Sequence, residues 1–134
     1  MKYMLLTYGN EQAWNLTADT EGARWSDADV KAMVAFMQAE NDKLTESGEL
    51  VYAEGLADPA TAKTVRHVDG ATVATDGPYL ESKEVLAGFW VIDCASYDRA
   101  VAIAARFSNC PGPGGVPLGA PIEVRPIGAA PEIP

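Results

Sequence analysis

The spacing of apolar and polar residues along the chain predicts four main strands and two helices. Four segments are rich in aliphatic and aromatic residues and end near Gly, Pro or Asp, which is typical of strands: residues 2–8, 49–56, 85–92 and 122–125. The segment 85–92 is apolar on both faces, as in a central strand, and Gly88 within it indicates a close approach by another backbone or side chain. The segment 122–125 alternates apolar and charged residues, which predicts one covered face.

The first predicted helix begins after Ser26 and ends before Gly48. The Ser26 hydroxyl can accept a first-turn amide proton while Asp29 reaches back to it, and Gly48 suits the left-handed residue that commonly follows a helix. Between them an apolar stripe with one polar break recurs at helical spacing: Val30, Met33, Val34, Met37, Asn41 and Leu44. A second helix begins at Ser96, and its predicted buried face consists of Ala100, Val101, Ile103, Ala104 and Phe107.

A hairpin is predicted between the second and third of the main strands. Asp69-Gly70 is a strong two-residue turn signal within residues 63–75. The register set by this turn places Arg66 and Asp76 on opposite faces of the hairpin. Without the hairpin, the element order is strand, helix, strand, strand, helix, strand, so we predict an α+β domain of the ferredoxin-like βαββαβ class with an inserted β-hairpin.

This layout predicts that the protein acts as a homodimer. We expect one domain over residues 1–127 and a frayed tail over residues 128–134. Two helices would cover one face of the sheet and leave the other face bare and half apolar. Such a face needs a partner, and face-to-face packing of two copies would create a cleft suited to a small molecule.

Composition narrows the class of protein. The 134 residues include 10 Lys and Arg against 19 Asp and Glu, a net charge of −9, which argues against direct nucleic-acid binding and docking on an anionic membrane. We expect no signal peptide or membrane span and a cytoplasmic location. Cys94, Cys110 and the single histidine, His67, are too few for a zinc site, so we expect free thiols and no cofactor, with an all-oxygen Mg²⁺ or Ca²⁺ site left open. His67 is either a general base or an ordinary surface residue.

Ionisable residues gather around a Gly-Pro turn, which is a candidate for catalysis. They are Asp76, Tyr79, Glu81, Lys83 and Glu84. Two carboxylates that share a poorly hydrated site raise the pKa of one of them, which can then act as a general acid or base, and Lys83 can stabilise an enolate or bind a carboxylate. We therefore take Asp76, Glu81 and Lys83 as candidate catalytic residues and Tyr79 as a candidate binding residue. The alternative is a turn cap by Asp76 with solvated charges beside it.

Charged residues within the apolar strands form a second candidate set. If the helices cover the apolar side of strand 122–125, Glu123 and Arg125 point into the dimer cleft. There Arg125 can bind a substrate carboxylate in a bidentate manner, with Glu54 and Arg66 as further binding residues. The alternative is an Arg–Glu ion pair that holds the dimer together.

Seven short motifs follow one another along the chain in an order that points to a known family. They are MKYMLLTYG at 1–9, EGL at 54–56, TVR at 64–66, DGPY at 76–79, ESKE at 81–84, GFWVID at 88–93 and EVRP at 123–126. Together they resemble the DGPF-type branch of the YCII-related proteins, with Tyr79 in place of the usual Phe. The resemblance implies a dimeric α/β-barrel built from ferredoxin-like halves.

The resemblance leaves two functions open. The wider superfamily is similar to small-molecule enzymes, including a dehydrochlorinase, that carry a His–Asp pair whose histidine lies on the first helix. No histidine lies between Ser26 and Gly48 here. One expected function is isomerase, lyase or hydrolase chemistry on a small carbonyl or carboxylate compound bound in the dimer cleft. The other is a non-enzymatic binding or regulatory module. The resemblance implies this second function because many DGPF-type genes look like neighbours of the genes for extracytoplasmic-function sigma factors.

Overall fold

The sheet and two helices of the protein follow the predicted ferredoxin-like order. The structure, a computed structural model, describes residues 1–9, 25–77 and 84–129. Its elements are β1 (Lys2–Gly9), α2 (Asp27–Ser47), β2 (Leu50–Gly55), η1 (Pro59–Thr61), β3 (Lys63–Val68), β4 (Ala71–Asp76), β5 (Val85–Asp93), α3 (Tyr97–Ser108), η2 (Pro113–Gly115) and β6 (Ile122–Pro126).

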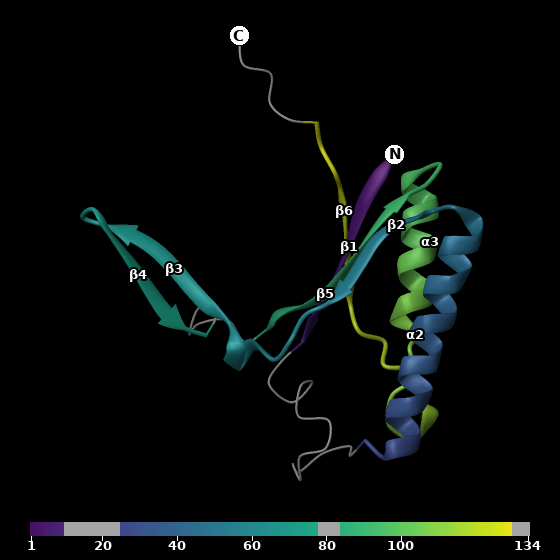
Figure 1. The fold of residues 1–134 in the computed structure, drawn as a ribbon. Coiled ribbons are helices and arrows are strands. Elements are labelled where there is room, and N and C mark those ends of the chain that lie inside the picture. Colours follow the sequence, from purple (N-terminus) through teal and green to yellow (C-terminus); the bar gives the residue numbers. More distant parts are fainter. Residues whose placement is uncertain (10–24, 78–83, 130–134) are drawn as a thin grey trace.

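Four of the strands form an antiparallel sheet in the order β2-β5-β1-β6, and β3 pairs with β4 in a separate hairpin. Helices α2 and α3 lie side by side against one face of the larger sheet (Figure 1). The prediction of an α+β, ferredoxin-like βαββαβ fold with an inserted hairpin is therefore confirmed. The dimeric arrangement stays a prediction, as does the domain boundary at residue 127.

Helix α2 begins and ends at the predicted residues. The Ser26 hydroxyl accepts a hydrogen bond from the Asp29 amide at 3.1 Å, and the Ser26 amide donates to the Asp29 carboxylate at 2.9 Å, which completes the capping box. Gly48 closes the helix with a left-handed φ of 80°. The Asp29 carboxylate also accepts a hydrogen bond from the Gly114 amide in η2 at 3.1 Å, so the same group holds the loop that follows α3.

The core lies between the sheet and the helices. It consists of Tyr3, Leu5, Leu44, Trp90, Ile92, Cys94, Ala100, Ile103, Ala104 and Phe107. The prediction that Val101 belongs to the buried face of the second helix was wrong, because its exposed fraction is 47%, and Val34 in the apolar stripe of α2 is likewise 52% exposed. Helix α2 reaches the core along a narrow line through Met37 and Leu44, which leaves the flank that carries Val34 in solvent.

A charged pair joins the two helices beside this core. Buried Glu40 on α2 accepts hydrogen bonds from Arg106 Nε on α3 at 2.8 Å and from Lys43 Nζ at 3.2 Å. Burial raises the pKa of Glu40, but the hydrogen bonds from Arg106 and Lys43 outweigh burial and hold the pKa below its usual value. Glu40 is therefore an ionised group that fixes the spacing of α2 and α3.

The β3–β4 hairpin projects away from the sheet and the helices (Figure 1). Asp69 and Gly70 form its turn, with φ values of 49° and 78°. Arg66 pairs with Val73 across the two strands, so Arg66 and Asp76 lie on opposite faces, as predicted.

A second ion pair ties the start of β2 to the start of α3 and makes the protein sensitive to acid. Arg99 donates to both carboxylate oxygens of Glu49, at 3.0 and 2.8 Å. These hydrogen bonds lower the pKa of Glu49 from 4.5 to about 2. Unfolded Glu49 takes up its proton near pH 4.5, so the stabilisation is complete above that pH and is lost as the pH falls towards 2.

We expect Arg99→Gln to lower the free energy of unfolding at neutral pH by about 1 kcal/mol, the value of a well-formed but partly exposed pair. The variant should also lose less stability than the wild type between pH 4.5 and 2, because its Glu49 pKa lies closer to the usual value. Urea denaturation across this pH range measures both effects. Lys31→Gln, which removes an exposed charge from α2, is the control, and an unchanged pH slope in Arg99→Gln would contradict the prediction.

Candidate functional site

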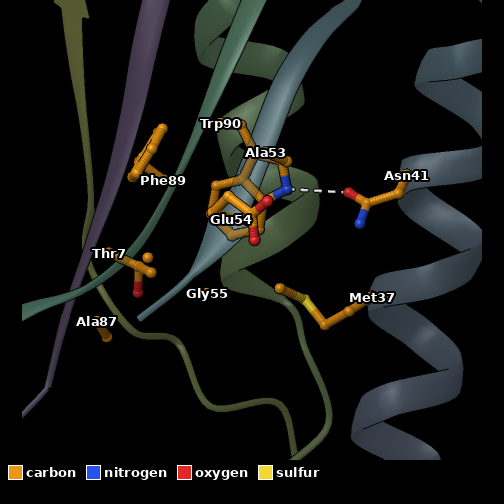
Figure 2. A pocket seen from close by; sticks show the side chains of 10 residues that line it. Thr7, Met37, Asn41, Ala53, Glu54, Gly55, Ala87, Phe89 and Trp90 are labelled. Atoms are coloured by element: carbon orange, nitrogen blue, oxygen red, sulfur yellow. Dashed lines mark hydrogen bonds between the residues drawn. The ribbon is translucent and has the colours of Figure 1, made fainter. Parts of the chain in front are cut away.

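A pocket of about 320 Å³ lies between α2 and the part of the sheet formed by β2 and β5 (Figure 2). Its lining residues are Thr7, Met37, Asn41, Ala53, Glu54, Gly55, Ala87, Gly88, Phe89 and Trp90. The volume is at the small end of the range of roughly 300 to 1,000 Å³ typical of ligand pockets. The pocket therefore suits a compact ligand.

The pocket is open because two glycines face each other across β2 and β5. Gly55 pairs with Gly88, whereas the neighbouring pair on the same face, Ala53 and Trp90, places an indole between the sheet and α2. At the glycine pair neither strand contributes a side chain to the corresponding space, and the Thr7 side chain of β1 lies beside it. Gly88 also permits close contact of the strands, since a Cβ there would lie 3.0 Å from the Glu54 carbonyl oxygen. This confirms the close approach predicted at Gly88.

The wall of the pocket is fixed by a hydrogen bond between the sheet and α2. Trp90 Nε1 donates to Asn41 Oδ1 at 2.9 Å (Figure 2). On its other side the indole stacks on Phe107 of α3, with ring centroids 4.1 Å apart. Asn41 is the polar break in the apolar stripe of α2, and the structure explains it, because a leucine there would leave the buried indole N–H without this acceptor.

Two of the lining residues present their side chains to the opposite face of the sheet, which the helices leave uncovered. Glu54 and Phe89 alternate with the pocket-facing residues, and Figure 2 shows Phe89 directed away from α2. On that face Tyr52 donates its hydroxyl hydrogen to Glu54 at 3.1 Å, and its ring lies 5.9 Å from Phe89. The hydrogen bond to Glu54 raises the pKa of Tyr52. Glu54 thus borders the pocket with its main chain and extends its carboxylate to the uncovered face.

The uncovered face has an apolar centre and charged margins. Strand register aligns two rows across it, one of Glu54, Phe89, Leu6 and Glu123, and one of Tyr52, Val91, Met4 and Arg125. Ile122 and Val124 pack against the core on the other face, which is why Glu123 and Arg125 lie here, as the alternating pattern predicts. Arg125 and Glu123 form an exposed ion pair at 3.6 Å.

The structure places the predicted site residues in separate regions. Asp76 forms an ion pair with Lys63 at 2.8 Å where the hairpin strands begin and end, and its side chain is 89% exposed, which matches the alternative of solvated charges. Arg66 is exposed on β3. Arg125 and Glu54 share the uncovered face but lie three strand spacings apart, roughly 14 Å. They are too far apart to hold one small group between them.

Three of the predicted residues, Tyr79, Glu81 and Lys83, lie outside the described part of the chain, so their roles stay predictions. Sequence analysis did not identify Asn41, Gly55 or Met37 as pocket residues. The available signal was a polar residue within an apolar helical stripe, together with two glycines in strands that could pair.

The described ranges contain no cluster of metal-binding side chains, since no three His, Cys, Asp or Glu side chains gather there into a group that could hold a metal ion. Cys94 and Cys110 are buried free thiols, and burial raises the pKa of Cys110. None of the helices seen in the structure is long and apolar enough to cross a membrane.

The fold and the pocket define a ferredoxin-like α+β protein with a small cavity beneath its first helix. The YCII-related domain matches residues 1–113 of the chain. An uncharacterized protein of Rhizobium meliloti (strain 1021) is 34% identical over 127 residues, which cover 95% of this chain and 92% of that relative. The chain belongs to the YCII-related family, and its assignment to the DGPF branch stays a prediction.

Two alanine substitutions should separate the roles of the paired glycines. Gly88→Ala forces a methyl group against the main chain of β2 and should lower the free energy of unfolding by about 1–3 kcal/mol. Gly55→Ala meets no atom within 4 Å and should leave stability unchanged or raise it by about 0.5 kcal/mol. Thermal and urea denaturation of both variants measures this. Equal effects of the two substitutions would contradict the close-approach argument.

Proposed function

We propose that this protein binds a compact, neutral and mostly apolar small molecule in the pocket between α2 and the sheet. The observation that carries the proposal is the cavity held open by Gly55 and Gly88, which a side chain at either position would reduce. Close packing is the rule in protein interiors, so a cavity of this size beside the core favours a binding role.

The side chains between the sheet and α2 favour a carbonyl compound. Trp90 and Met37 supply apolar walls, and Met37 adapts readily to the shape of a ligand. Asn41 uses its amide oxygen for Trp90, which leaves its amide hydrogens, together with the Thr7 hydroxyl, to donate to a ligand. These donors complement a carbonyl oxygen.

Charge argues against a carboxylate ligand in this pocket. Among the described lining residues the single ionisable one is Glu54, which is acidic. Because the Glu54 carboxylate lies on the opposite face of the sheet, a carboxylate ligand would enter this pocket without a cationic partner among the described lining residues. Of the two ligand classes expected from the sequence, the neutral carbonyl compound therefore fits better, and binding is the role we propose. Acid–base catalysis by Asp76, Glu81 and Lys83 stays a separate prediction.

We propose further that the protein acts as a homodimer joined through the uncovered face. Met4, Leu6, Phe89 and Val91 form the apolar centre of this face. Two helices cannot cover both sides of the sheet, and a second copy supplies the missing layer. The charged residues at the margins, Glu54, Glu123 and Arg125, then form a polar rim.

Filling the pocket should abolish ligand binding without unfolding the protein. Gly55→Val directs its side chain into the pocket from a position where a Cβ meets no atom within 4 Å. We expect ligand-observed NMR to find binders among small neutral ketones, lactones and amides, and Gly55→Val to weaken their binding at least tenfold. Gly128→Val is the matched control, because Gly128 is remote from the pocket and equally free of contacts. An empty screen, or equal binding by Gly55→Val, would overturn the proposal.

A charge in the centre of the uncovered face should separate the subunits. Val91→Glu places a carboxylate there and should weaken dimerisation by about a hundredfold or more, because the charge would be buried without a partner. Val34→Glu makes the same chemical change on the exposed flank of α2 and should leave the dimer intact. Sedimentation velocity measures both. A wild-type protein that sediments as a monomer at micromolar concentration would contradict the dimer.

A further inference from the structure

The β3–β4 hairpin lacks the support that a two-stranded ribbon normally needs. All residues of β4 are exposed, and within β3 only Thr64 is partly buried. In Figure 1 the hairpin extends away from the rest of the described chain. A single two-stranded hairpin is at best marginally stable in water, so this segment requires a surface to pack against.

One face of the hairpin suits contact with another protein surface. Strand register places Thr64, Arg66, Val68, Ala71, Val73 and Thr75 together on this face. Val68 and Val73 are both exposed large apolar residues. Thr64 and Thr75 flank them with β-branched side chains, and Arg66 is the single charge on the face. Because charges across an interface are arranged to be complementary, this cation favours contact with a surface that carries a negative charge.

Charge identifies the complementary surface. On the opposite hairpin face Lys63 is already paired with Asp76, whereas Arg66 forms no ion pair with the described residues. On the uncovered face of the sheet Glu123 is paired with Arg125, whereas Glu54 is bonded only to the neutral hydroxyl of Tyr52 among the described groups. Glu54 therefore lacks a cation, and Arg66 lacks an anion.

We propose that the β3–β4 hairpin is an arm that packs on a second copy of this chain, where its Arg66 forms an ion pair with the partner's Glu54. The inference rests on the homodimer proposed above. It adds a second contact, in which the hairpin of each copy packs on the other copy. Because the main chain of Glu54 borders the pocket, each arm would reach the rim of the partner's pocket. The Asp69-Gly70 turn, which forms the tip of the arm, thus serves dimerisation.

A charge swap tests this pairing. Arg66→Glu and Glu54→Arg should each weaken the dimer about tenfold or more, because each places like charges opposite one another. The double variant Arg66→Glu/Glu54→Arg should restore most of the lost affinity, as measured by sedimentation equilibrium. The matched control is Arg66→Glu/Glu123→Arg, which should not restore it. Circular dichroism of each variant verifies that the fold is retained.

These variants distinguish a failure of the proposed arm from a failure of the proposed dimer. If Val91→Glu dissociates the dimer but neither Arg66→Glu nor Glu54→Arg weakens it, the proposed role of the hairpin arm is wrong and the proposed dimer stands. Equal rescue by Glu54→Arg and Glu123→Arg would overturn the assignment of Glu54. As a second measurement, Arg66→Cys protein mixed with Glu54→Cys protein should form a covalent heterodimer with a short bismaleimide, and its absence would count against the arm.

Discussion

The constraint on which this structure depends is that two helices cover only one face of a four-stranded sheet. On the covered face, aromatic and aliphatic residues of β1 and β5 meet α3 and form a dense core around Tyr3, Ile92 and Phe107. On the other face the same strands present Met4, Leu6, Phe89 and Val91, which alternate with the core residues and so point away from α2 and α3. The core and the proposed dimer contact are thus opposite sides of the same strands.

Helix α2 is attached to the body largely by polar contacts. Asn41 bonds the Trp90 indole, Glu40 bonds Arg106, and Asp29 reaches the loop after α3. In the described part of the chain, Met37 and Leu44 are the residues of α2 that pack in the apolar core. This attachment explains how a cavity persists beneath α2, because hydrogen bonds of fixed length hold the helix away from the glycine pair.

The sequence predicted the features that local chemistry determines. Ser26 and Gly48 fixed the ends of α2, Asp69-Gly70 fixed the hairpin register, and Gly88 indicated strand contact. Contacts between elements that are distant in the sequence could not be predicted from local chemistry. Glu40 is buried because Arg106, 66 residues away, lies opposite it, and the pocket requires Gly55 to pair with Gly88, which strand composition does not reveal. The pairing of Asp76 with Lys63, by contrast, follows from the hairpin register that the Asp-Gly turn sets.

The Asp29 carboxylate links the first turn of α2 to the loop that follows α3. It bonds both the start of α2 and the amide of Gly114, 85 residues further along the chain. The hydrogen bonds from Ser26 are the main cause of the lowered pKa of Asp29, and the hydrogen bond from the Gly114 amide lowers this pKa further. Fraying of the first helical turn therefore also breaks the hydrogen bond that the loop makes through Gly114, which couples the local opening of two segments distant in sequence.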